Sequence, residues 1–179
     1  MSADRSTEAD EDGPSWDIET LEDLIRVPNF HDWMDLRVVD VEPGEATIWL
    51  PYREELVGNP KIPSIHGGIL AGLIDLAGGA ATFTLTNAPT PTIDLRIDYV
   101  RPALQRNTVA AAEIVNAGST IAFVDVDVLQ LPEDAGITEP DQVDPEQLDE
   151  VGKLVATGRA TYSTKNAKPE AGPDDIPIG

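Results

Sequence analysis

The segment from Gly67 to about Thr84 carries apolar or small residues at almost every position. A run of this length is typical of a helix, and a helix without a polar face is buried on all sides rather than lying on the protein surface. We therefore expect one long central helix, enclosed by the segments that precede and follow it.

The segments before this helix predict a short helical region and a hairpin. Apolar residues recur first at helical spacing and then in two short strand-like runs, and Pro43-Gly44 between those runs is typical of a turn. The expected elements are a helix over 18–27 ended by Pro28, a short turn over 30–34, strands over 36–41 and 46–50, and a loop that ends at His66.

Apolar and polar residues alternate in the segments after the central helix, as at Ile93, Leu95 and Ile97. This period of two predicts strands. The expected strands cover residues 92–99, 108–116, 120–131 and 154–163. Consecutive strands pair locally, so these four should form an antiparallel meander. The predicted fold class is α+β, with a curved antiparallel sheet wrapped around a long central helix.

The length of 179 residues suits one domain with a sizeable core. Residues 1–16 are acidic and polar, and residues 166–179 are rich in Pro, Ala, Asp and Gly, so we expect two disordered tails around a domain over 17–165. Within the domain, residues 132–151 are acidic, contain prolines and lack periodicity. That stretch predicts an extended insertion loop without catalytic content.

The chain is strongly acidic, with a formal net charge of −21 from 33 acidic and 12 basic residues. This charge argues against nucleic acids and anionic membranes as partners. The acidity is spread along the chain, and only four of the basic residues are lysines. Such a composition favours a halophilic protein, adapted to a cytosol of very high salt, over an ordinary acidic one.

The chain contains no cysteine, and its two histidines are His31 and His66. Disulfides, thiolate metal sites and a cysteine nucleophile are thereby excluded, and a multi-histidine metal site is not expected. There is no apolar run of 18 residues and no signal-peptide pattern. We therefore expect a cytoplasmic protein that binds no metal.

Two features of the central helix suggest attack on a carbonyl group. The turn His66-Gly67-Gly68 opens the helix, where free N–H groups attract developing negative charge. Asp75 lies further along the same apolar helix, where an unpaired carboxylate is energetically costly. The eight residue steps from Gly67 to Asp75 span about 12 Å along a helix, which is too far for both to act on one carbonyl. Two antiparallel copies of the helix in a two-fold dimer would solve this and create two equal sites.

Several motifs occur in a specific order along residues 35–165, outside the insertion. They are Gly58-Asn59-Pro60, His66-Gly67-Gly68, Asp75 nine residues after the histidine, the stretch TIDLRIDYVRPA over 92–103, and the closing stretch GKLVATG over 152–158. With this set the chain resembles hotdog-fold acyl-CoA thioesterases of the phenylacetic acid degradation (PaaI-like) family. The resemblance implies a hotdog fold, a dimer or tetramer, and hydrolysis of acyl-CoA to free acid and CoA without a cofactor.

The resemblance also implies roles for individual residues. The Gly67 N–H would polarise the thioester carbonyl, and Asp75 would act as nucleophile or general base. Asn59 would assist substrate binding, and Thr92 would orient water. In this acidic chain the candidates for CoA contacts are Gly68, Lys61, Arg101 and Arg106, although solvated surface charge also explains the three basic residues.

Each residue also has a structural interpretation. Asp75 can be a capping carboxylate, His66 a helix N-cap rather than an acid–base group, and His31 a partly buried structural residue. Asn59 sits beside a proline, where Asn is common in turns. Strand alternation places Thr92 on the face of its strand opposite Ile93. Thr92 therefore reaches the site only if this polar face, or the bent end of the strand, lies at the dimer interface.

Two other functions fit the same fold. One is a hydratase or dehydratase, in which His66 and Asp75 would exchange protons with an enoyl chain, and they too would have to come from different subunits. The other is a non-catalytic acyl-CoA-binding protein, although such a protein has no reason to bury Asp75.

Overall fold

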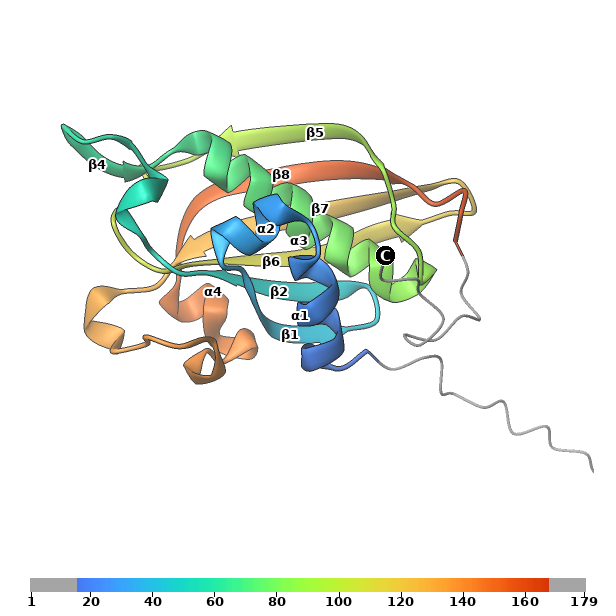
Figure 1. The fold of residues 1–179 in the computed structure, drawn as a ribbon, viewed down its shortest axis with the longest axis horizontal. Coiled ribbons are helices and arrows are strands. Elements are labelled where there is room, and N and C mark those ends of the chain that lie inside the picture. Colours follow the sequence, from blue (N-terminus) through green and yellow to red (C-terminus); the bar gives the residue numbers. More distant parts are fainter. Residues whose placement is uncertain (1–15, 168–179) are drawn as a thin grey trace, which may run out of the picture.

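The computed structural model describes residues 16–167, in which a six-stranded antiparallel sheet curves around one long helix (Figure 1). The strand order is β1-β2-β6-β7-β8-β5, which leaves β1 and β5 at the edges. The predicted meander of the last four strands is therefore wrong for the first of them: β6 pairs with β2, and β5 pairs with β8 at the opposite edge. The elements are α1 (Ile18–Arg26), α2 (Asn29–Met34), β1 (Arg37–Glu42), β2 (Glu45–Leu50), β3 (Val57–Asn59), β4 (Ile62–Ile65), α3 (Gly67–Thr86), β5 (Thr92–Tyr99), β6 (Thr108–Ala117), β7 (Ile121–Gln130), α4 (Leu148–Val151) and β8 (Lys153–Ser163).

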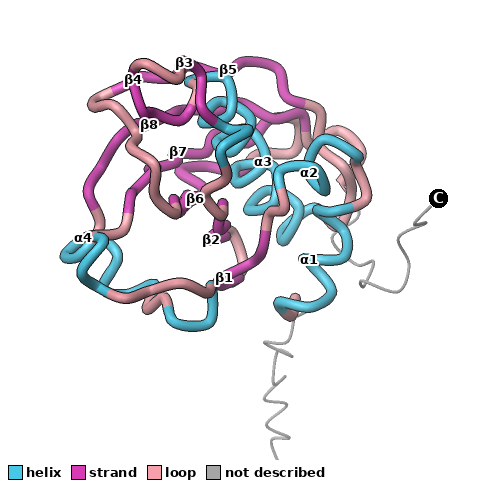
Figure 2. The backbone as a smooth tube through the Cα atoms, turned by 60° about the vertical axis from the view of Figure 1, so that its left-hand side comes forward, coloured by secondary structure: helices cyan, strands magenta, loops and turns pink. Residues whose placement is uncertain are grey.

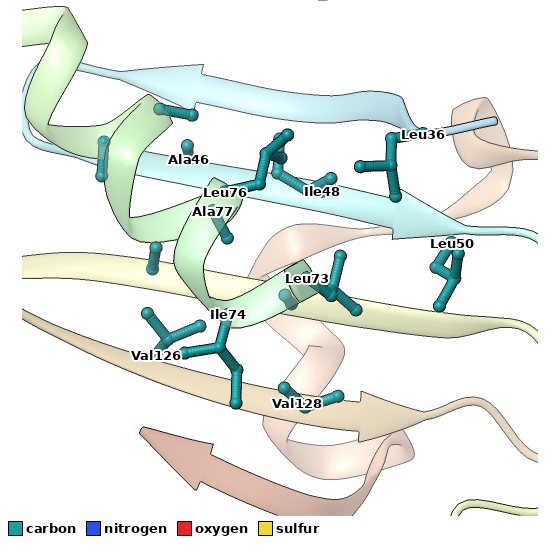
Figure 3. Packing of buried hydrophobic residues seen from close by; sticks show 14 of the residues in the cluster. Leu36, Ala46, Ile48, Leu50, Leu73, Ile74, Leu76, Ala77, Val126 and Val128 are labelled. Atoms are coloured by element: carbon teal, nitrogen blue, oxygen red, sulfur yellow. The ribbon is translucent and has the colours of Figure 1, made fainter. Parts of the chain in front are cut away.

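The central helix α3 lies in the concave side of the sheet, as its apolar sequence predicted. Its side chains Leu73, Ile74 and Ala77 point toward buried residues of β2 and β7, among them Ile48 and Val126 (Figure 3). By length and composition α3 could cross a membrane, but 56% of its most apolar stretch is buried inside the protein. The predicted α+β architecture around a long central helix is confirmed.

The segment before α3, which we expected to be a loop, contains a small hairpin. Strands β3 and β4 pair with each other, apart from the large sheet, with Val57 opposite Ile65 and Asn59 opposite Ile62. Pro60 lies in the turn between the two strands, where a missing N–H costs nothing. The expected loop is therefore a hairpin that leads into α3, with Pro60 in its turn and Pro63 within β4.

The insertion over residues 132–151 is folded rather than extended. It contains three 3-10 turns and α4, and it places Val143 and Leu148 against Trp49. Trp49 faces away from α3, since its neighbours Ile48 and Leu50 belong to the central core. The insertion thus covers part of the outer face of the sheet, on the side opposite α1 and α2 (Figure 2). Its few apolar residues are irregularly spaced, so no periodicity showed that they would be buried.

The ends of the domain differ slightly from the expected boundaries. Trp16, which we placed in the acidic tail, is buried, and its ring packs edge-on against Phe83 at 5.0 Å between centroids. Residues 166 and 167 of the C-terminal tail are also described. The rest of the two predicted tails, residues 1–15 and 168–179, lies outside the described residues.

Candidate active site

Three elements meet around Asp75, which lies half-buried on α3. The Thr92 hydroxyl on β5 donates a hydrogen bond to Asp75 Oδ1 over 2.7 Å. The Tyr162 hydroxyl on β8 donates to the Asp75 backbone carbonyl over 2.6 Å. Burial raises the pKa of Tyr162 above its usual range, and the negative charge of Asp75 acts in the same direction, so this phenol stays a neutral donor.

An irregularity in β5 explains how Thr92 reaches Asp75. Thr92 pairs with Tyr162 and Asp94 pairs with Thr161, so the register shifts between them and Ile93 is an extra residue. Ile93 is 58% exposed, whereas Thr92 shares the helix-facing side with Leu95. Strict alternation, which put Thr92 on the face opposite Leu95, is therefore wrong at this end of the strand.

His66 caps the N-terminus of α3. Its Nδ1 accepts a hydrogen bond from the Gly68 N–H over 2.9 Å, so the N–H of Gly68 is already occupied. Because Nδ1 is the acceptor, the neutral imidazole carries its proton on Nε2. The Gly67 N–H, in contrast, has no acceptor within residues 16–167. One free donor thus remains at the positive end of the helix.

Tyr99 fixes the first residue of α3 from the other side. Its hydroxyl donates to the Gly67 carbonyl over 2.8 Å, and a Cβ at position 67 would lie 3.2 Å from its ring. Only glycine leaves the ring undisturbed in this place. Sequence reasoning missed this role, although the alternation in β5 does place Tyr99 on the same side as Leu95 and Ile97.

The β3–β4 hairpin lies beside His66. The His66 N–H donates to the Leu56 carbonyl over 2.8 Å, and Gly58 lies against the imidazole, where a Cβ would be 2.9 Å from the ring. Asn59 is exposed near the hairpin tip, and its Oδ1 accepts from the Lys61 N–H over 3.0 Å. Asn59 therefore belongs to the His66 end of α3 and not to the Asp75 end.

The basic residues proposed for CoA contacts differ in their present partners. Arg101 donates to the Leu154 carbonyl over 2.8 Å, and Arg106 lies 3.4 Å from the Glu133 carboxylate. The exposed Lys61 side chain makes no ion pair with any residue of the described part. Across residues 16–167 no group of three or more His, Cys, Asp or Glu side chains is arranged to hold a metal ion.

A cavity of about 370 Å³ opens beside Asp75 and Thr92, between α1 and α3. Tyr162 and His31 also line it, and the remaining walls are largely apolar. His31, which the sequence led us to treat as purely structural, approaches the Ile25 carbonyl with Nδ1 at 2.9 Å. A lone histidine in a predicted short turn gave no signal that it would line the same cavity as Asp75.

The candidate residues thus form two groups at different positions along one helix. Asp75 and Thr92 line the cavity, whereas His66, Gly67 and Asn59 do not. The rise of α3 separates Gly67 from Asp75 by about 12 Å. Within one protomer these groups cannot reach the same carbonyl, because donor and base must each lie about 3 Å from the reacting group.

Comparison with known proteins identifies the family. The thioesterase superfamily model matches residues 63–136. A Halobacterium salinarum protein provisionally named an esterase is 36% identical over 116 residues, which cover 62% of this chain and 76% of that protein. The medium/long-chain acyl-CoA thioesterase YigI of Salmonella typhimurium is 32% identical over 114 residues, covering 55% of this chain and 74% of YigI.

A solved structure extends the likeness to the fold. A mutant of the phenylacetic acid degradation protein PaaI from Thermus thermophilus superposes with a TM-score of 0.57 at 27% identity. The superposition covers 76% of this chain and 98% of that one. Together with the helix enclosed by a curved antiparallel sheet, these relatives place the chain in the hotdog-fold thioesterase superfamily, in its PaaI-like branch.

Proposed function

We propose that this protein hydrolyses acyl-CoA thioesters to free acid and CoA, without metal or cofactor, at sites shared between two subunits. Asp75 and Thr92 of one protomer would act with the Gly67 N–H of its partner. The observation that carries this proposal is the pairing of a half-buried, hydrogen-bonded carboxylate with a free helix N-terminal donor about 12 Å away on the same helix.

The chemistry uses each of these groups once. The Gly67 N–H donates to the thioester carbonyl oxygen, where negative charge develops at the positive end of α3. As general base, Asp75 takes a proton from water while the water oxygen attacks the carbonyl carbon. The C–S bond then breaks and the proton passes to the leaving thiolate. As nucleophile, the same carboxylate would attack the carbonyl carbon and form an anhydride while the C–S bond breaks and CoA leaves as thiolate. Water would then hydrolyse the anhydride, releasing the acid and a proton for the thiolate.

The hydrogen bond from Thr92 distinguishes the two carboxylate oxygens of Asp75. The Thr92 hydroxyl occupies Oδ1, so Oδ2 is the oxygen left for water or substrate. His66 contributes by shaping the start of the helix, because its hold on the Gly68 N–H leaves Gly67 as the donor for substrate. Asn59 would assist binding from the neighbouring hairpin, with Lys61 as the favoured partner for CoA phosphates because Arg101 and Arg106 already have partners.

A two-fold dimer through β5 would bring the two groups together. β5 is an eight-residue edge strand that pairs with β8, and no strand among residues 16–167 pairs with its other edge. A long free edge is a template for another strand, and apolar side chains are exposed at both of its ends, Ile93 in the strand and Val100 just after it. Pairing of β5 with β5 of a second copy would extend the sheet and set the two α3 helices side by side in opposite directions.

The direct test is release of CoA from short, medium, long and aromatic acyl-CoA substrates, in the presence of a metal chelator. We expect Asp75→Asn to lower kcat by about 10²- to 10⁴-fold, the usual contribution of a general base. Asp149→Asn, at an exposed position of α4 away from β5 and the candidate site, is the matched control for the loss of one negative charge. No release from any substrate would overturn the proposed function, and full activity of Asp75→Asn would overturn the mechanism.

A further inference from the structure

The cavity beside Asp75 is lined by side chains of α1 and α3, and we call it the acyl channel for the proposal below. One wall comes from Leu21, Leu24 and Ile25 of α1, and the other from Leu76, Ala80 and Phe83 of α3. The hydroxyls of Thr92 and Tyr162 are both directed at Asp75 rather than into the channel. Apart from these groups, the polar side chains of the lining are His31 and Thr90, and most of the remaining lining is apolar.

The length of the channel sets the size of what it can hold. From Asp75 to Phe83 the helix rises about 12 Å. An extended chain advances about 1.2 Å per bond, since a residue with three backbone bonds spans about 3.5 Å. The α3 wall of the channel therefore matches roughly ten bonds of an extended chain.

Helix α1 is a fixed wall of this channel. Its Glu22 carboxylate accepts hydrogen bonds from the Arg37 guanidinium at 2.6 Å and from the Val38 N–H at 2.9 Å, which tie it to β1. Next to its N-terminus the Trp16 ring packs edge-on against Phe83 of α3, and the Ile25 carbonyl near its C-terminus is approached by His31 Nδ1. Helix α1 is held at both ends and along its length, so it limits what fits against α3.

We propose that this channel holds an unbranched acyl chain of medium length, about ten carbons, in the protomer that supplies Asp75, and that α1 sets the chain length. This rests on the proposed function, because the thioester carbonyl must lie at Asp75 for the chain to enter the channel. Each methylene buried there improves binding roughly fourfold. Selectivity should therefore rise with chain length until the channel is full.

The test measures kcat/KM for saturated acyl-CoAs from butyryl to palmitoyl with three variants of the full chain. Leu24→Trp fills the channel from α1, and we expect the ratio of decanoyl-CoA to butyryl-CoA kcat/KM to fall at least about tenfold. Leu24→Ala widens it and should move the optimum toward longer chains. Ile18→Trp, an exposed position on the same helix that does not line the channel, should leave the profile of the wild type.

The possible results distinguish failure of the acyl-channel proposal from failure of the proposed thioesterase function. If the wild type releases no CoA from any substrate, the proposed function fails. If it is active but Leu24→Trp and Leu24→Ala keep the wild-type chain-length profile, with melting temperatures showing that both are folded, the channel does not hold the acyl chain. A change that Ile18→Trp reproduces would also overturn the inference.

Discussion

Gly67 matters both for packing against Tyr99 and for the proposed chemistry. Its N–H is free among the described residues, and the Tyr99 ring lies 3.2 Å from the place where a Cβ would be. It is also the first residue of α3, a position where proline is tolerated because the N–H makes no intrahelical bond. The preceding His66 has φ −63° and ψ 134°, which a residue before proline adopts readily.

These features allow the N–H to be removed without changing the backbone. We expect Gly67→Pro to lower kcat by about 10²- to 10³-fold, the loss seen when one oxyanion donor is removed. Gly67→Ala adds a Cβ against Tyr99 but keeps the N–H, so it reports the cost of that contact alone. Steady-state kinetics of CoA release compares the two variants, and equal losses for proline and alanine would show that the donor is not used.

At the scale of elements, the sequence predicted what periodicity reveals and missed what depends on local irregularity. The central helix and the strands β5 to β8 followed from their hydrophobic patterns. The meander held only for β6, β7 and β8, because β5 pairs with β8 and not with its neighbour in sequence, β6. The position of Thr92 did not follow from periodicity, because a single extra residue at Ile93 reverses the face of the strand end. The burial of Val143 and Leu148 was missed because they pack on a tryptophan face that only the folded sheet creates.

The contact between β8 and α3 has a measurable dependence on pH. Burial raises the pKa of Tyr162 above its ordinary value of 10.0, so the folded state resists its ionisation. The stability from this burial is fully present below the unfolded pKa and is lost as pH rises above it. Above about pH 10 the free energy of unfolding should fall by up to about 1.4 kcal/mol per pH unit through this group.

Tyr162→Phe removes both the hydrogen bond to the Asp75 carbonyl and this titration. We expect a loss of about 1 kcal/mol at neutral pH and a shallower fall of stability above about pH 10. Urea unfolding across this range measures both quantities, with Tyr52→Phe as the control at a phenol outside the α3–β8 contact. An identical alkaline slope for Tyr162→Phe and the wild type would contradict the assignment.

At the scale of the whole molecule, different segments of the chain cover the two faces of the sheet. The concave face holds α3 and the candidate site, whereas the acidic insertion covers part of the outer face (Figure 2). The net charge of −21 adds self-repulsion to this arrangement. From this acidity we predict that the fold is adapted to high salt.

We therefore expect the melting temperature to rise with salt. Screening shortens the Debye length from about 10 Å at 0.1 M to about 3 Å at 1 M, so a KCl titration should give most of the rise below about 0.5 M. A rise that is linear up to about 2 M would instead indicate exclusion of salt from the surface. A melting temperature that stays constant or falls over the titration would contradict salt adaptation by charge.

The claim that each site is shared between two subunits can be tested by complementation. Asp75→Asn and Gly67→Pro chains are each expected to form inactive homodimers. A mixed dimer of the two would contain one site with both groups intact and one site with both groups lost. Random pairing makes half of the dimers mixed, each with one of its two sites working, so an equimolar mixture should recover about a quarter of wild-type activity.

The decisive measurement is CoA release by such a mixture, co-expressed or refolded together and compared with each variant alone. The two-subunit site predicts recovery near a quarter of the wild-type rate, reached only when both chains are present. If the mixture stays as inactive as its components, although native mass spectrometry shows that mixed dimers have formed, the site lies within one protomer and the account is wrong.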